Sequence, residues 1–98
     1  MNLQHIELCC NITDEQLLPL VEAIRGHTSL MYLDLRSNRI GDVGCAAIAS
    51  LLELNCNLRF LDFNNNAITN EGAIAIANSL TNNTNLQGLG LEGNPTYR

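Results

Sequence analysis

Lysine is absent from this chain of 98 residues, and only five arginines stand against ten carboxylates. The net charge of −5 argues against a nucleic-acid ligand, because a basic surface is needed to neutralise phosphates. No apolar run approaches the roughly 20 residues that cross a bilayer. The opening segment, MNLQHIELCC, lacks the charged and apolar regions of a signal peptide. We therefore expect a cytoplasmic protein without a membrane partner, and a basic protein or peptide as the favoured ligand.

The sequence also lacks the patterns that hold metals, cofactors or reacting groups. Its cysteines form no Cys-x-x-Cys pair, and its two histidines complete no zinc spacing. Cys9 and Cys10 are neighbours, so we expect them to point to opposite faces of a strand and all four thiols to be free. No glycine-rich phosphate loop is present, and no nucleophile stands beside a base. We expect no metal site, no cofactor and no enzymatic activity.

What the sequence does contain is a leucine pattern, L-x-x-L-x-L-x-x-N, that recurs at intervals of 27, 28 and 28 residues. The four copies read LQHIELCCN, LMYLDLRSN, LRFLDFNNN and LQGLGLEGN. Alternating apolar residues within each copy are typical of a strand, and the apolar spacing that follows the first three copies is typical of an amphipathic helix. A single domain, 1–98, is thus divided into units 3–29, 30–57 and 58–85 and a partial unit 86–98.

One strand–helix unit cannot bury its own apolar side, whereas stacked units share a continuous core. We therefore predict an α/β fold, a horseshoe-shaped solenoid of about three and a half units. Parallel strands line its concave face and helices its convex face. The asparagine that ends each copy stands where the chain leaves the strand, and a stacked side-chain amide can pair with the neighbouring turns. We predict a structural ladder of Asn11, Asn38, Asn66 and Asn94.

These motifs resemble the leucine-rich repeats of the ribonuclease-inhibitor type and of NOD-like receptors. The segments LRSNRIGDVG (35–44) and LLPLV (17–21) are close in style to that type, and the resemblance covers essentially the whole chain. It implies a leucine-rich-repeat horseshoe that serves as a scaffold for binding other proteins. The first unit departs from the pattern, because it is one residue short before Ile12 and has Gln16 where later units have Gly44 and Gly72. No capping module is evident at either end, so we expect both ends to be adhesive.

Side chains that alternate with the leucines are expected to face the concave side in columns, with neighbours about 4.8 Å apart. The first column is His5, Tyr32, Phe60, Gly88; the second is Glu7, Asp34, Asp62, Gly90; the third is Cys9, Arg36, Asn64, Glu92. Exposed aromatic residues and arginine dominate binding energy at interfaces. We predict a partner-binding site formed by Tyr32, Asp34, Arg36, Phe60, Asp62, Asn64, His5 and Glu7, with Tyr32 and Phe60 as its anchors.

Three alternatives stand beside this prediction. The concave residues can be consensus features of the repeat, with Arg36 and Arg59 neutralising acidic neighbours. The chain can be a fragment, or a subunit that forms a homo-oligomer through its uncapped ends. More remotely, some repeats of this shape, as in the Ran GTPase-activating protein, assist GTP hydrolysis; only Arg36, the one arginine in the columns, favours such an accessory role.

Overall fold

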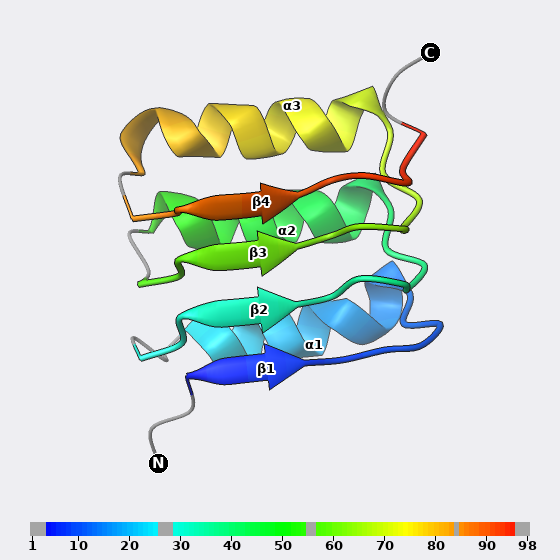
Figure 1. Ribbon diagram of the computed structural model, residues 1–98, viewed down its shortest axis with the longest axis horizontal. Coiled ribbons are helices and arrows are strands. Elements are labelled where there is room, and N and C mark those ends of the chain that lie inside the picture. Colours follow the sequence, from blue (N-terminus) through cyan, green and yellow to red (C-terminus); the bar gives the residue numbers. More distant parts are fainter. Residues whose placement is uncertain (1–3, 26–28, 55–56, 84, 96–98) are drawn as a thin grey trace.

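The computed structural model describes residues 4–25, 29–54, 57–83 and 85–95. Four short strands form one parallel sheet in chain order: β1 (His5–Glu7), β2 (Tyr32–Asp34), β3 (Phe60–Asp62) and β4 (Gly88–Gly90). The helices α1 (Asp14–Arg25), α2 (Asp42–Glu53) and α3 (Asn70–Ser79) form a second layer behind the sheet, and a short 3-10 helix, η1 (Leu80–Asn82), follows α3 (Figure 1). Parallel strands alternating with a helical layer confirm the predicted α/β solenoid.

The strands pair in register, so equivalent positions of successive units lie side by side. Tyr32 lies opposite His5, Phe60 opposite Tyr32, and Gly88 opposite Phe60. The first and second predicted columns therefore follow from the register of the sheet, while the third lies beyond the strand ends.

The leucines of the repeated pattern pack between the sheet and the helices. Leu33 and Leu35 are fully buried, and Leu61 is only 2% exposed. Leu89, at the same position in β4, is 37% exposed. The difference arises because a helix follows each of the first three strands in the chain, whereas no described helix follows β4 (Figure 1). The described end of the stack after β4 thus presents an apolar edge.

Aspartate side chains join the starts of successive helices. Asp14 and Asp42 lie in the first turns of α1 and α2, and each accepts hydrogen bonds from the start of the next helix. Asp14 Oδ1 accepts the N–H of Gly41 at 2.8 Å. Asp42 Oδ1 accepts the N–H groups of Thr69 at 2.8 Å and Gly72 at 3.0 Å, and its other oxygen accepts the Thr69 hydroxyl. Each aspartate therefore joins its own unit to the following one while satisfying free N–H groups at a helix N-terminus.

These contacts predict an acid-sensitive contribution to stability. The Thr69 hydroxyl, followed by the N–H groups of Thr69 and Gly72, lowers the pKa of Asp42 although burial opposes the shift. Because the folded pKa lies below the unfolded value of about 3.9, the stabilisation is complete above that value and is lost as pH falls through the folded pKa. Asp42→Ala should lower the free energy of unfolding at pH 7 by about 1–2 kcal/mol. Urea unfolding from pH 7 to pH 2 should show the two proteins converging; a difference that is independent of pH would contradict the role of the carboxylate.

Glycines in the first turns of α2 and α3 permit each helix to approach the preceding one closely. A Cβ on Gly44 would lie 2.5 Å from Asp14 Oδ1, and a Cβ on Gly72 would lie 2.6 Å from Asp42 Oδ1. The first unit has Gln16 at this position, where no preceding helix is described. There, Gln16 Oε1 accepts the N–H of Thr13 at 3.1 Å. Gln16 thus supplies a hydrogen-bond acceptor to the start of its own helix. At the starts of α2 and α3, the acceptor is an aspartate of the preceding helix.

Side-chain amides connect the turns that follow the strands. Asn38 Nδ2 donates to the carbonyls of Leu8 and Leu35, each at 2.9 Å, and its Oδ1 accepts the N–H of Ile12 at 3.0 Å. Asn66 repeats the pattern one unit later, with Nδ2 donating to Leu35 and Phe63 and Oδ1 accepting from Ile40. Asn94 in turn donates to the carbonyls of Phe63 and Leu91 and accepts from Ile68. Every amide therefore spans two adjacent units.

Asn11 departs from this row and corrects the predicted four-membered ladder. Its side chain is exposed, and its backbone has a φ of 70°. Positive φ occurs at Ser37 and Asn65 as well, each one residue before a ladder asparagine. The missing residue between Asn11 and Ile12 explains the difference, because the first unit must complete the same turn with a shorter segment. Within the described residues the amide row begins at Asn38.

The thiols are free where the structure describes them: Cys9 and Cys10 are exposed and Cys45 is buried. Burial raises the pKa of the Cys45 thiol to about 12. Cys9 and Cys10 do not diverge as expected, because β1 ends at Glu7 and the two residues lie in the turn beyond it. A hydrogen bond with the Cys10 side chain and the charge of that group raise the pKa of Cys9. Cys56 lies outside the described residues.

Among the described helices, none has the length and apolar character needed to cross a bilayer.

Candidate functional site

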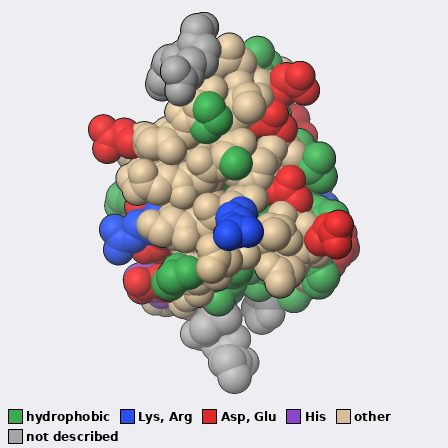
Figure 2. Space-filling model, turned by 90° about the vertical axis from the view of Figure 1, so that its right-hand side faces the viewer, with side chains coloured by type: hydrophobic (Ala, Val, Ile, Leu, Met, Phe, Trp, Pro, Cys, Tyr) green, Lys and Arg blue, Asp and Glu red, His purple; other side chains and the backbone are tan. Residues whose placement is uncertain are grey.

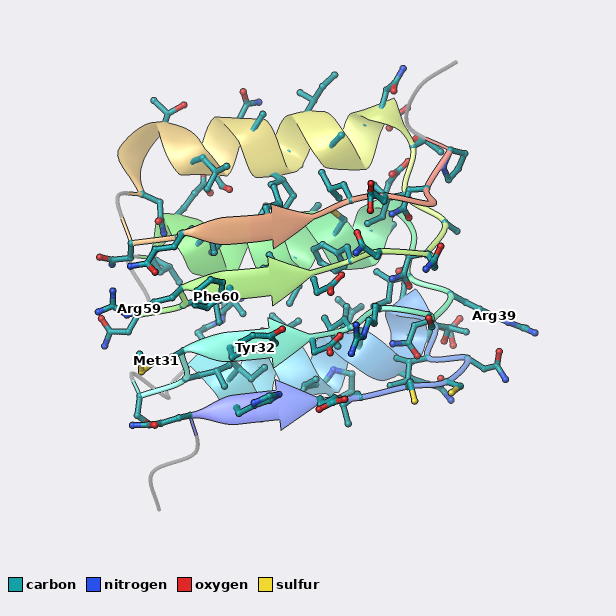
Figure 3. All side chains as sticks on the ribbon, viewed as in Figure 1. Met31, Tyr32, Arg39, Arg59 and Phe60 are labelled. Carbon is teal, nitrogen blue, oxygen red and sulfur yellow. The ribbon has the colours of Figure 1, made fainter. Side chains whose placement is uncertain are left out.

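An aromatic row crosses the exposed face of the sheet. The His5 and Tyr32 rings stack with centroids 4.5 Å apart and an interplanar angle of 23°. The Tyr32 and Phe60 rings are 5.6 Å apart and tilted by 35° (Figure 3). These separations lie in the range of favourable ring contacts. Because the strands are in register, three equivalent positions place their rings in contact before any partner arrives.

The aromatic row ends at Phe60, because the next position, Gly88 on β4, has no side chain. A Cβ on Gly88 would lie 2.8 Å from Phe60 Cδ1, so the Phe60 ring occupies the space above that glycine. Phe60 as a whole remains 41% exposed. Beside it lies a hollow of about 190 Å³, lined by Tyr32, Phe60, Leu61, Asp62, Gly88, Leu89 and Gly90. The sequence placed Gly88 and Gly90 in the predicted columns. The hollow that they border beside Phe60 became apparent only in the three-dimensional structure.

The acidic column is less accessible than predicted, because Asp34 is only 3% exposed. Arg36 covers its charge in two ways: the Arg36 N–H donates to Asp34 Oδ1 at 3.2 Å, and Arg36 Nε lies 3.2 Å from Asp34 Oδ2. The expectation that Asp34 contributes an exposed carboxylate is therefore corrected. At this position the structure agrees with the alternative in which Arg36 neutralises an acidic neighbour.

Asp62 stands at the equivalent position of the next strand but has a different neighbour. Its Oδ1 accepts the N–H of Asn64 at 2.9 Å, as Asp34 does from Arg36. The Asn64 side chain carries no charge, and its Oδ1 accepts the N–H of Glu92 at 2.8 Å. In the part of the chain that the structure describes, no basic side chain forms an ion pair with Asp62. The half-buried carboxylate of Asp62 thus lacks the cation that Asp34 has.

The two remaining predicted residues lie at the β1 edge. His5 Nε2 is 3.5 Å from Glu7 Oε1, and both side chains are more than half exposed. Arg59, expected to neutralise acidic neighbours, forms no ion pair among the described residues. Figure 3 places it with Met31 at the starts of the strands. Its Nε is buried without a hydrogen-bond partner.

Acidic groups also gather away from the sheet. Figure 2 views the edge where the strands end and the helices begin, and acidic side chains recur on its helical side. The first turns of the helices supply them: Asp14, Glu15, Asp42 and Glu71. Net charge alone therefore does not favour the concave face as the site for a basic partner. Such a preference depends on the arrangement of individual side chains on that face. No cluster of three or more metal-binding side chains occurs among the described residues.

Comparison with known proteins agrees with this architecture. A family model described as Leucine Rich repeat matches residues 26–49 and 54–77. A solved structure titled "Leiomodin-1 Actin-Binding Site 2 (ABS2)" superposes with a TM-score of 0.80 at 30% sequence identity, over 88% of this chain. This chain spans 51% of the length of that one. No curated protein sequence matches the chain significantly. The fold is that of a leucine-rich-repeat solenoid. These matches do not identify the ribonuclease-inhibitor subtype.

Proposed function

We propose that this leucine-rich-repeat solenoid is a protein-interaction module that binds a protein or peptide through the concave face of its sheet. The aromatic row of His5, Tyr32 and Phe60 carries the proposal. Rings that already contact one another lose little conformational freedom on binding, so more of their contact energy is available to the complex. Phe60 is exposed and Tyr32 is partly exposed, which leaves apolar surface for a partner to cover.

The similar structure gives the proposal independent support. Its title describes an actin-binding site, so a solenoid of closely similar shape is part of a protein-binding region in that protein. Actin is accordingly the first defined partner to test with this chain. Binding of purified actin, measured by sedimentation or fluorescence, would identify one partner. If actin does not bind, the partner of the concave face is a different protein.

Removing the two central rings tests the site itself. Tyr32→Ala combined with Phe60→Ala should weaken capture of the partner by about a hundredfold, because each buried aromatic anchor is expected to contribute about 1.4 kcal/mol, a factor of ten. The circular dichroism spectrum should not change, since both side chains lie on the exposed face of the sheet. Affinity capture from cell extract, followed by titration of the recovered protein, measures the effect.

A matched control removes apolar surface from the helical side instead. Val43 and Ile74 are 62% and 58% exposed on α2 and α3. Val43→Ala with Ile74→Ala should leave capture intact. If this control abolishes capture and the concave double variant does not, the partner binds the helical face and the proposed site is wrong.

A further inference from the structure

We infer that the hollow between Phe60 and Asp62 receives the guanidinium group of an arginine from the partner. This inference rests on the proposed function and specifies the chemistry of the ligand at one point of the concave face. It follows from a comparison of two equivalent positions in neighbouring units, one of which contains an arginine of this chain and one of which does not.

In the second unit, the site is filled from within. Asp34 accepts the backbone N–H of Arg36 through one oxygen and lies 3.2 Å from the Arg36 Nε through the other. In the third unit, Asp62 accepts the backbone N–H of Asn64 in the same way, at 2.9 Å. The remaining oxygen has no cation among the described residues, because the position of Arg36 is occupied by the neutral Asn64. One unit therefore shows the pairing that the other lacks.

The space for an external cation is created by glycine. Gly88 and Gly90 replace the side chains that would otherwise continue the first and second columns on β4. A Cβ on Gly90 would lie 2.8 Å from Asp62 Oδ1, and one on Gly88 would lie 2.8 Å from Phe60 Cδ1. Both the carboxylate and the ring thus border the same hollow, and neither glycine can be replaced without filling it.

The two walls of the hollow favour a planar cation. Phe60, which is 41% exposed as a whole, offers its ring, and a guanidinium group stacks on aromatic faces as well as pairing with carboxylates. Asp62 lies beside Asp34 across the sheet, and among the described residues Arg36 alone forms an ion pair with either of these two carboxylates. An incoming positive charge relieves that imbalance. A neutral side chain leaves the negative charge unbalanced, and an acidic one adds to it.

Nuclear magnetic resonance titration with a capped amino acid tests the inference. N-acetyl-arginine-N-methylamide should shift the backbone amide signals of Leu61, Asp62, Gly88 and Gly90 in a saturable manner. N-acetyl-citrulline-N-methylamide, which has nearly the same shape without the charge, should produce shifts at least tenfold weaker. Equal shifts with the two probes, or no shifts at these residues with arginine, would overturn the inference.

Two variants sharpen the result. Asp62→Asn removes the charge and should abolish the difference between the two probes. Asn64→Arg copies the arrangement of Asp34 and Arg36, so it should pair with Asp62 internally and exclude the arginine probe. Both substitutions are at partly buried surface positions, and the dispersion of the amide spectrum reports whether each variant is folded.

The inference can fail separately from the proposed function. If Tyr32→Ala with Phe60→Ala abolishes capture of the partner while Asp62→Asn and Asn64→Arg leave it unchanged, the concave face binds its partner without an arginine in this hollow. If none of these variants affects capture, the concave site itself is wrong.

Discussion

Asn66→Ala is expected to lower the free energy of unfolding by about 3 kcal/mol, because three partly buried backbone groups lose their partner at once. The Asn66 amide donates to the carbonyls of Leu35 and Phe63, and its oxygen accepts from the N–H of Ile40. Alanine cannot replace any of these bonds, and the turns of the second and third units keep only their backbone hydrogen bonds, such as that from the N–H of Ala67 to the carbonyl of Ile40. Asn66→Asp should have a comparable effect, since a carboxylate cannot donate to the two carbonyls.

Equilibrium unfolding in urea, followed by circular dichroism, measures this loss. Asn11→Gly is the matched control, because Asn11 is exposed and has a positive φ that glycine adopts without strain. We expect that control to remain within about 0.5 kcal/mol of the original protein. Equal destabilisation by the two substitutions would show that the amide row does not hold the units together.

Gly72→Gln is the second substitution with a large expected effect, of about 3 kcal/mol. The added side chain would start 2.6 Å from Asp42 Oδ1 and 2.7 Å from Ile68 Cγ2, and Cys45 Cβ is 3.3 Å away. Asp42 and Cys45 belong to α2, so α3 would have to move away from it. That movement would also break the hydrogen bonds between Asp42 and the start of α3.

The first unit provides the comparison for this experiment. Gln16 stands at the position of Gly72 and is exposed. Gln16→Ala should cost no more than about 1 kcal/mol, through the loss of one exposed hydrogen bond to Thr13. Thermal unfolding of both variants ranks them directly. Should Gly72→Gln prove as well tolerated as Gln16→Ala, the packing of α2 against α3 does not depend on that glycine.

The fold was predictable because the repeated pattern is local, and each unit specifies the same strand, turn and helix. The register of the columns was also predictable, since identical units stack with identical offsets. Two features could not be derived from the pattern alone. Arg36 pairs with Asp34 inside the second unit, and Asp42 accepts hydrogen bonds from the start of α3, which belongs to the next unit.

The loss of Asn11 from the amide row has a different origin. A single missing residue changed the path of one turn, and a pattern match that aligns the letter N across four copies cannot detect that change. The aromatic row was predicted as a column of positions, whereas the space beside Phe60 depends on two glycines whose effect is visible only once the strands are paired.

Gln16 sets α1 apart from the two helices that follow it. Gly44 and Gly72 leave room for the close approach of the preceding helix, whereas the exposed Gln16 side chain accepts the N–H of Thr13. A helix packed against this turn of α1 would have to displace that side chain and break its hydrogen bond. The start of α1 is therefore less suited than the starts of α2 and α3 to contact with another unit of the same kind.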